Sequence, residues 1–585
     1  MSHSPTGIRR IPVALIPLAA FLLAVAFVPD EAVLRTKVVW GWALIMATAA
    51  TVLIADAARD RLSVRWPRFL LAALAPGLLA VLWFLGPESL IRSLAGDEVR
   101  RLLCVPVVVW AVSSCLGSPQ VRRLFLFILM VTVIPVAGYA LAQKLAGTLN
   151  LPVDAVARSA STFGNPVFLG AYFVLTTPLC AAGALYGIGL VRWAGAVATG
   201  LALPALLATE SRWAWMGFAV SLVVGVVLLA PSVSLRRRLL LATLAVGIGL
   251  AAFSSRVMLR PQGHALIWRD TAIMIASRPW GVGPGQFDVA FLPYASPELL
   301  AAYPRATTII NDAHCEPLQV LAELGWAGFV ILLVVLWELA RAARRTLLAL
   351  PADDPERPFL VAALASLAGA AAQSLGSPDL RFMVTTLLLA TVAGFAASFA
   401  APRPLRVPFG RAGKAGLVAV GALGLFILAR NAHADLQLAS LVKPQAPFEP
   451  SPAAAARIED LQQLVLDQPN DPMLRYQLGA ALAEERYYAS AAIAFRDAAR
   501  LSGGGAAAIR SLGIAESLAG QHAEAVPHLR AALADNPADD DVRYLLAYSS
   551  YGLGEIGTAI TELEILLAKR PDHPQARLLL GKLRE

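Results

Sequence analysis

The chain has 585 residues, of which 57% are hydrophobic and only 15% are charged. Soluble globular proteins contain about 45–50% apolar and about 25% charged residues, so this composition excludes a soluble enzyme, a disordered chain and a fibrous one. The formal net charge of +9 comes from residues 1–450, because residues 451–585 are more acidic than basic, and it gives no support for nucleic-acid binding.

Thirteen apolar stretches precede residue 431, and most are long enough to cross a bilayer about 30 Å thick as a helix of about 20 residues. The first follows Arg9 and Arg10 and is longer than the apolar part of a typical signal peptide, so we expect an uncleaved helix. The sequence predicts an all-α polytopic bundle of about 12–13 spans, at 11–28, 37–57, 69–86, 102–117, 124–143, 167–188, 193–209, 213–230, 239–253, 317–340, 358–375, 382–400 and 415–430.

Basic connections between the spans predict their orientation. With the N-terminus in the cytoplasm, nearly all of these connections fall on the cytoplasmic side, as the positive-inside rule requires. They lie at 59–68, 122–123, 192, 236–238, 341–345 and 403–414. The connections at 144–166, 209–212, 254–316 and 376–381 are then expected on the outer face. An odd number of spans also places everything after residue 430 there.

From residue 472 the sequence repeats every 34 residues, in three full copies. Small residues recur at 479, 513, 547 and 581, large apolar residues recur at 495, 529 and 563, and Gly or Pro follows at 503, 537 and 571. This spacing resembles the tetratricopeptide repeat, in which small residues let paired helices approach closely. We expect an α-solenoid at 451–585 after a linker at 431–450. It offers a concave surface for a protein partner, or it serves only as a spacer.

The outer connections carry polar residues that membrane insertion does not require. Charged side chains at this depth are costly unless they line a cavity or pair with one another, although a single arginine can also extend its charge to water. Several basic groups on one face, with a histidine among them, predict a site for an anionic ligand. The polar segments are 158–166, 210–213, 256–287 and 311–325.

Four motifs stand in a fixed order in these segments. They are Ser-Thr-Phe-Gly-Asn-Pro at 161–166, Glu-Ser-Arg-Trp-Ala-Trp at 210–215, Trp-Arg-Asp at 268–270 with Arg-Pro-Trp-Gly-Val-Gly-Pro-Gly-Gln-Phe at 278–287, and Asp-Ala-His-Cys-Glu-Pro-Leu-Gln at 312–319. The ordered set, over about residues 150–400, resembles the O-antigen ligase and polymerase family. This family includes lipopolysaccharide O-antigen ligases, polymerases of lipid-linked polysaccharide repeats and protein O-oligosaccharyltransferases.

The resemblance implies a GT-C-like glycan-transferase domain at 1–430, with its catalytic loop at 254–316, in the bacterial inner membrane. The site and the repeats are expected to face the periplasm. The donor would be a glycan on undecaprenyl diphosphate, and the acceptor hydroxyl would belong to a glycan, to lipid A-core or to a protein. A departing diphosphate needs cations, and arginine presents a planar fork that matches phosphate oxygens.

Carried over by position, His314 is the base and Arg212 is a diphosphate contact. Histidine suits the first role because it titrates near neutral pH. A second catalytic cation is expected from Arg269 or Arg260, because His264 stands where the family's arginine is expected. The remaining expected contacts are Arg158 and His264 for the diphosphate, and Asn165, Glu210 and Gln286 for the substrate.

No metal or cofactor is expected, since these connections contain no Asp-x-Asp or paired-carboxylate cluster. Gly281-Val-Gly-Pro-Gly lacks the Lys-Ser/Thr that a nucleotide loop requires, and Cys315 is more typical of a small residue at a helix entrance than of a nucleophile. Polymerase activity and transfer onto protein remain open within the same chemistry. In other classes, a transporter or flippase and a membrane-anchored repeat scaffold remain open, although no internal symmetry supports transport.

Overall fold

The computed structural model describes residues 12–27, 36–85, 92–149, 158–229, 264–302, 310, 312–406, 410, 413, 416, 452–485, 487–553 and 555–584. The chain divides into two compact units. The first, here called the bundle unit, contains 1–85, 97–284 and 312–442, and the second, the repeat unit, contains 86–96, 285–311 and 443–585. The expected linker at 431–450 lies outside the described residues, and the predicted domain boundaries stay predictions.

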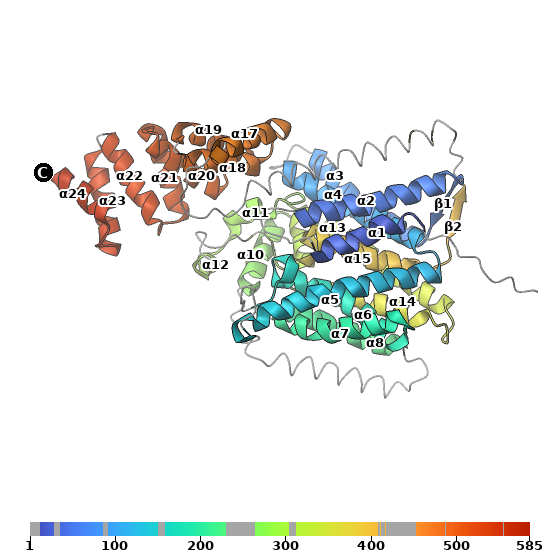
Figure 1. Cartoon of the computed structure of the whole chain (residues 1–585). Helices are drawn as coiled ribbons and strands as arrows, with labels where there is room; N and C mark the ends of the chain where they lie inside the picture. The colour runs from blue at the N-terminus through green and yellow to red at the C-terminus, as the bar shows by residue number, and fades with distance from the viewer. Residues whose placement is uncertain are drawn as a thin grey trace, which may run out of the picture. The chain divides into compact units, whose positions relative to one another are not determined.

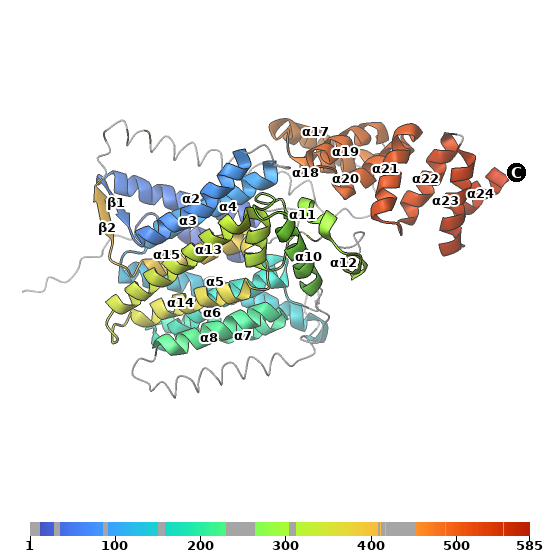
Figure 2. The same cartoon turned by 180° about the vertical axis from the view of Figure 1, so that it is seen from behind.

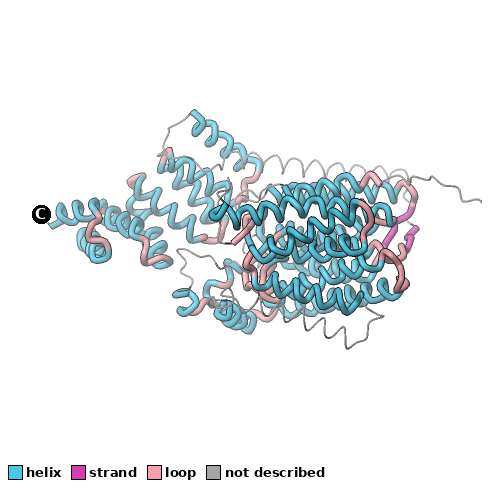
Figure 3. Tube along the Cα trace, turned by 60° about the horizontal axis from the view of Figure 1, so that its bottom comes forward, coloured by secondary structure: helices cyan, strands magenta, loops and turns pink. Residues whose placement is uncertain are grey.

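The bundle unit is built almost entirely of helices (Figure 3). Every expected span that falls on described residues coincides with a helix, whereas the spans expected at 239–253 and 415–430 lie outside them. Seven of the described helices, namely α2, α3, α5, α6, α7, α8 and α13, are long and apolar enough to cross a membrane. The helices are α1 (Leu15–Phe27), α2 (Thr36–Ala57), α3 (Pro67–Leu85), α4 (Arg92–Cys115), α5 (Pro119–Leu149), α6 (Pro166–Tyr186), α7 (Leu190–Ala208), α8 (Arg212–Leu229), α10 (His264–Ser277), α13 (Glu316–Ala349), α14 (Arg357–Gln373) and α15 (Met383–Ala397).

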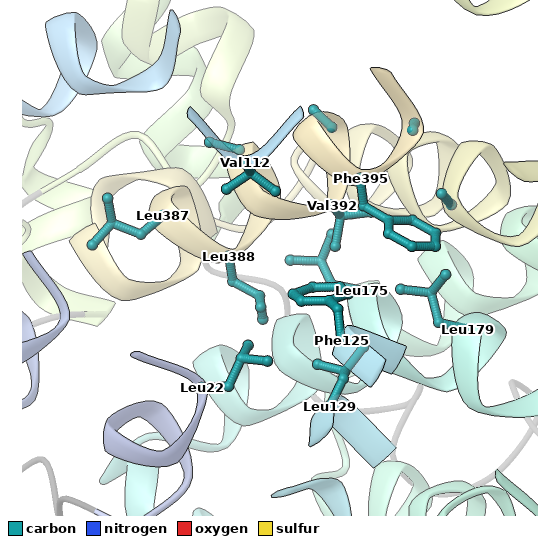
Figure 4. Close-up of a cluster of buried hydrophobic side chains, with 14 of the residues drawn as sticks. Leu22, Val112, Phe125, Leu129, Leu175, Leu179, Leu387, Leu388, Val392 and Phe395 are labelled. Carbon is teal, nitrogen blue, oxygen red and sulfur yellow. The ribbon is translucent and has the colours of Figure 1, made fainter. Parts of the chain in front are cut away.

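The core of the bundle joins helices that are far apart in the sequence. Figure 4 shows side chains of α1, α4, α5, α6 and α15 gathered in one apolar cluster. Phe125 of α5 stacks on Phe395 of α15 with 5.5 Å between ring centroids. Small residues bring other helices into close contact, because a Cβ on Gly217 of α8 would lie 2.6 Å from the carbonyl oxygen of Gly369 of α14.

One end of the bundle brings together two of the basic connections. Residues Arg61–Val64 (β1) and Arg403–Arg406 (β2) form an antiparallel ribbon, with Arg61 opposite Arg406. The sequence did not predict this pair of strands, because neither segment pairs with a neighbour along the chain. Figures 1 and 2 show the ribbon at one end of the bundle and α10 at the other. Connections 59–68 and 403–406, which we expected on one side of the membrane, therefore do lie together.

Described residues of each of the four expected outer connections lie at the opposite end of the bundle unit, which we call the α10 end. Ser159 donates a backbone hydrogen bond to the carbonyl of Ala208 (3.0 Å), which joins the segment before α6 to the turn between α7 and α8. Glu316 donates another to the carbonyl of Ser374 (2.9 Å), which joins the start of α13 to the connection after α14. The short helix η3 (Asp379–Arg381) belongs to that connection. Which membrane face this end occupies stays a prediction.

The repeat unit contains the expected helical pairs. A Cβ on Gly479 would lie 2.8 Å from the ring of Phe495, so the small residue does permit close approach of two helices. The helices α17 and α24 lie before and after the three repeats. The elements are α11 (Phe287–Ala290), η2 (Leu292–Tyr294), α12 (Pro297–Ala302), α17 (Pro452–Asp467), α18 (Pro472–Glu484), α19 (Tyr488–Leu501), α20 (Ala506–Leu518), α21 (His522–Asp535), α22 (Asp540–Gly552), α23 (Ile556–Lys569) and α24 (Pro574–Arg584).

Candidate functional site

His314 lies in the short segment that enters α13, in a backbone conformation that is rare for its residue type. Its φ of +49° is in the left-handed region, which costs a non-glycine residue about 1–3 kcal/mol and persists only where the surroundings enforce it. Asp312 Oδ1 accepts hydrogen bonds from the backbone nitrogen of His314 and from its ring Nδ1, both at 2.7 Å. This contact directs Nε2 away from Asp312, so Nε2 is the ring atom suited to accept a proton.

Asp312 keeps its negative charge in spite of being buried. Burial by itself raises the pKa of this carboxyl, but the hydrogen bonds and positive charge of His314 and the positive charge of Arg381 outweigh it. The pKa of Asp312 is therefore below its usual value. Its carboxylate can orient the imidazole of His314 and stabilise the protonated ring, as the acidic member of a catalytic triad does.

A second histidine, His264, begins α10 and stacks on His314. The two ring centroids lie 4.7 Å apart, with an interplanar angle of 28°. Burial lowers the pKa of His264 to about 4, with further contributions from the positive charges of His314 and Arg212. His264 is thus uncharged at neutral pH. The structure brings His314, His264 and Arg212, which the sequence scatters over about 100 positions, close enough to interact electrostatically.

Arg212 is the first residue of α8, directly after a tight turn. Glu210 makes this turn possible with a φ of +49°. The next residue along, Trp213, lies 6.4 Å from Trp268 of α10 between ring centroids. A Cβ on Gly376 would lie 1.8 Å from Trp213, so the connection after α14 also packs directly on this indole. Trp213 therefore fixes the start of α8 against α10 and thereby places Arg212 near the two histidines.

Two other predicted residues lie at the same turn. Arg158 donates from Nε to the carbonyl of Thr209 at 3.1 Å. Glu210 forms an ion pair with Lys144 of α5 at 2.8 Å, a partner that the sequence did not predict. The structure therefore groups Arg158 and Glu210 with Arg212, while their roles toward diphosphate and substrate stay predictions.

The remaining predicted residues have other settings. Asn165 caps α6, because its Oδ1 accepts a hydrogen bond from the backbone nitrogen of Val167 at 2.8 Å. Arg269 pairs with Asp270 at 2.9 Å, and it projects from a different face of α10 than His264 and Trp268 do. Gln286 is fully buried in the repeat unit, and Arg260 lies outside the described residues. The expected roles of these residues stay predictions.

Sequence reasoning missed a buried network of opposite charges that adjoins His314. Arg381 of η3 pairs with Glu323 of α13 at 2.9 Å, and the backbone nitrogen of Leu380 donates to Glu316 at 3.1 Å. Arg101 of α4 pairs with Glu98 and donates to the carbonyl of Leu380. A usable signal did exist, because charged residues at the ends of apolar stretches are costly unless they find partners. The sequence alone did not say which charges meet.

Among the described side chains of the site, His314 can act as a base and Arg212 as a cation, whereas Cys315 is not suited to react. Burial raises the pKa of Cys315, which makes this thiol a poor nucleophile. Among the described residues, no group of three or more His, Cys, Asp and Glu side chains could hold a metal ion. The arrangement can remove a proton at His314 and stabilise negative charge near Arg212.

Comparison with known families bears on the region that contains this site. Residues 197–333 match a family model described as O-Antigen ligase. This region is an O-antigen ligase domain. It includes Arg212, His264 and His314, and the family resemblance predicted from the ordered motifs is confirmed. The O-antigen ligase domain is a membrane glycan-transferring domain of the ligase or polymerase type. Residues 518–583 match the Tetratricopeptide repeat, which confirms the predicted repeats.

No curated protein matches the chain. Similar solved structures include "MamA 41-end from Desulfovibrio magneticus RS-1", with 25% identity, 23% of this chain and 75% of that chain covered, and a TM-score of 0.22. The "MamA RS-1 ArsTM double mutant" has 25% identity over 22% and 73%, with a TM-score of 0.21. The "APC/C hetero-tetramer Cut9-Hcn1" has 14% identity over 84% and 93%, with a TM-score of 0.21.

Proposed function

We propose that the protein transfers an oligo- or polysaccharide from undecaprenyl diphosphate to an acceptor hydroxyl at the periplasmic face of the bacterial inner membrane. The observation that carries the proposal is the cluster of His314, His264 and Arg212, with Asp312 bonded to the ring of His314. The reaction needs a base to deprotonate the acceptor hydroxyl and a cation to stabilise the departing diphosphate, and this cluster contains both. The O-antigen ligase domain supplies the reaction class.

In the proposed reaction, Nε2 of His314 takes the proton of the acceptor hydroxyl while the hydroxyl oxygen bonds to the anomeric carbon of the donor sugar. The bond from this carbon to the diphosphate oxygen breaks, and the diphosphate leaves with the bonding electron pair. Arg212 stabilises the charge that develops on the leaving group, since a guanidinium can donate two parallel hydrogen bonds to phosphate oxygens. Arg158, which donates to the carbonyl of Thr209 in the adjoining turn, adds positive charge around the same place, and Lys144 of α5 pairs with Glu210 of that turn.

The orientation is part of the proposal. The arginines of 59–68 and 403–406 lie at one end of the bundle and the candidate site lies at the other, and this arrangement together with the positive-inside rule supports the outer face for the site. The repeat unit would then bind a protein partner of the cell envelope through its helical surface.

The test in cells replaces the two central residues singly, as His314→Ala and Arg212→Ala. We expect losses of about 10²–10⁴-fold and about 10²–10³-fold in glycan transfer, because a general base and a charge-stabilising donor make contributions of this size. The size pattern of cell-envelope glycans is the readout. Arg345→Ala, an exposed arginine at the other end of α13, is the control and should leave the pattern unchanged.

The pattern of loss also separates the acceptors. Polymer that accumulates on the lipid carrier indicates a ligase, single repeats indicate a polymerase, and a change in the mass of a glycoprotein indicates transfer onto protein. Normal glycans from well-expressed His314→Ala and Arg212→Ala variants would contradict the proposal.

A further inference from the structure

Two side chains hold the segment around His314, and they belong to different parts of the chain. Asp312 contacts His314 itself, within the segment. At the preceding residue, the backbone nitrogen of the buried Ala313 donates a hydrogen bond to Oε1 of Gln319 at 2.7 Å. Gln319 is six residues further along and is the fourth residue of α13. Its side chain therefore reaches back over the helix start to hold the residue directly before His314.

The orientation of the Gln319 amide is fixed from its other end. Its Nε2 donates to Oε1 of Glu323, one turn further along α13, at 2.7 Å. The two contacts need different groups, because the backbone nitrogen of Ala313 requires an acceptor and Glu323 requires a donor. An amide satisfies both at once. Gln319 and Glu323 are 5% and 3% exposed, so water does not compete for these bonds.

Glu323 is held in turn by a separate connection of the chain. The same Oε1 accepts from Arg381 of η3 at 2.9 Å. The backbone of η3 is anchored on two sides, because Leu380 donates to Glu316 and its carbonyl accepts from Arg101. The path from Arg381 through Glu323 and Gln319 to Ala313 thus ties the left-handed segment of His314 to the connection between α14 and α15.

We infer that Gln319 is a positioning residue that sets the placement of the His314 imidazole, and that the buried Glu323–Arg381 pair orients the Gln319 amide for this task. This inference rests on the proposed function only for the role of His314 as base. Gln319 does not touch substrate in this scheme. Its loss should leave donor binding almost intact and slow the chemical step, because misplacement of a base by about 1 Å can cost about a hundredfold in rate.

The first variant is Gln319→Met, which keeps the length of the side chain and removes both hydrogen bonds. We expect kcat to fall by about ten- to a hundredfold with KM for the undecaprenyl-diphosphate-linked donor changed by less than about threefold. Gln373→Met is the matched control. Gln373 of α14 is also fully buried, but neither of its amide atoms has a hydrogen-bond partner within the described part of the chain. The kcat of the Gln373→Met variant should equal that of the wild type.

The second variant, Gln319→Glu, tests the donor and acceptor pattern. A protonated Glu at this position can accept from Ala313 and donate to Glu323, whereas an ionised one would face the carboxylate of Glu323. The charged groups around it are Glu323 and Glu316 of α13, Asp312, Arg381 of η3 and Arg101 of α4. We expect the ratio of variant to wild-type rate to rise by about tenfold between about pH 8 and about pH 6. The ratio for Gln319→Met should stay flat.

A readout independent of catalysis separates this inference from the proposed function. Hydrogen exchange at the Ala313 amide and the rate at which diethyl pyrocarbonate modifies His314 should each rise at least about fivefold in Gln319→Met. Wild-type protein that transfers no glycan while these rates rise would contradict the proposed function alone. Unchanged exchange and modification, or a Gln319→Met variant with wild-type kcat, would overturn the positioning role. If Gln319→Met does not fold, the pH ratio of Gln319→Glu decides, and a flat ratio overturns the inference.

Discussion

At the scale of single residues, the two stacked histidines differ in their charged neighbours, and this difference gives them different properties. His314 has a carboxylate partner in Asp312, whereas His264 faces the positive charges of His314 and Arg212 and is partly buried. Positive charge at neutral pH is thus supplied by Arg212, and His264 contributes a neutral ring beside it. An arriving diphosphate would favour protonation of His264, because its negative charge offsets these neighbours.

The low pKa of His264 predicts a pH dependence of stability. Its pKa is about 4 in the folded protein, against 6.5 for an unperturbed histidine. Between these values the unfolded chain binds a proton that the folded protein does not, so stability falls as the pH is lowered from about 6.5 to about 4. In His264→Gln this loss should shrink. Thermal unfolding of the purified protein in detergent, measured across this range, is the check.

A permanently charged side chain provides the comparison for this prediction. In His264→Arg the charge is present at every pH, so the variant should be destabilised by a constant amount and should not regain stability as the pH rises through this window. Identical pH dependence in wild type, His264→Gln and His264→Arg would contradict the assignment of a lowered pKa to His264.

Sequence patterns could identify His314 and Arg212 because each stands in a motif with recognisable neighbours. They could not identify the contacts that place them. The bond from Asp312 to the ring of His314 depends on a left-handed backbone at residue 314, and no spacing rule predicts that conformation. Arg269 and His264 were both candidates for contact with the diphosphate. Only the observed helix α10, which contains both residues, shows that they project from different faces of it.

At the scale of elements, three segments meet on one indole. Trp213 of α8 contacts Trp268 of α10, and Gly376 of the connection after α14 packs against its ring. This contact is the structural reason that the cation of α8 and the histidine of α10 share one site. Interhelical packing on a large aromatic surface is well suited to hold such an arrangement rigidly.

Gly376→Ala should disturb this arrangement, because the added methyl group would lie 1.8 Å from Trp213. We expect a destabilisation of about 1–3 kcal/mol, typical of overpacking, together with a fall of about tenfold in glycan transfer. Apparent melting temperature and transfer rate are the measurements. Gly138→Ala in α5 is the matched control, since a Cβ on Gly138 would have no other atom within 4 Å. Equal behaviour of the two variants would show that Trp213 does not organise the site.

The helices were predictable from the sequence because each expected span is an apolar stretch, and most of these stretches are long enough to cross a bilayer. The ribbon of β1 and β2 was not, since its two strands are only four residues long each and lie more than 300 residues apart in the chain. The buried pair of Arg381 with Glu323 was not predictable for a related reason, whereas Glu98 and Arg101 lie three residues apart on the same helix, α4. Charge costs predict that such residues find partners, but the partners are chosen by packing between distant helices.

At the scale of the whole molecule, the chain combines two units with different sources of cohesion. The bundle unit holds its helices by close packing of small and aromatic residues. The repeat unit holds its helices by nearest-neighbour contacts between repeats, which include the ion pairs of Arg510 with Asp539 at 2.6 Å and of Arg496 with Glu516 at 2.8 Å. Such arrays gain stability from each added repeat, so we expect a fragment of residues 452–585 to fold alone.

Two glycines at equivalent repeat positions test the packing of this fragment. Gly479→Ala would place a Cβ 2.8 Å from the ring of Phe495, and we expect it to lower the free energy of unfolding by about 1–3 kcal/mol. Gly581→Ala occupies the same position in the last helix, where nothing lies within 4 Å, and should be neutral or slightly stabilising. Urea unfolding followed by circular dichroism measures both. A fragment without helical signal, or equal effects of the two changes, would contradict this account of the repeats.

The proposed function requires that the cluster of His314, His264 and Arg212 cleaves a glycan from a lipid diphosphate. Its most direct measurement is the release of undecaprenyl diphosphate from a labelled undecaprenyl-diphosphate oligosaccharide in proteoliposomes that contain native acceptors, because this product is common to ligase, polymerase and protein transfer. We expect release by the wild type and a loss of at least about a hundredfold in His314→Ala and in Arg212→Ala. Undiminished release by both variants, or movement of label across the bilayer with the diphosphate bond intact, would contradict it.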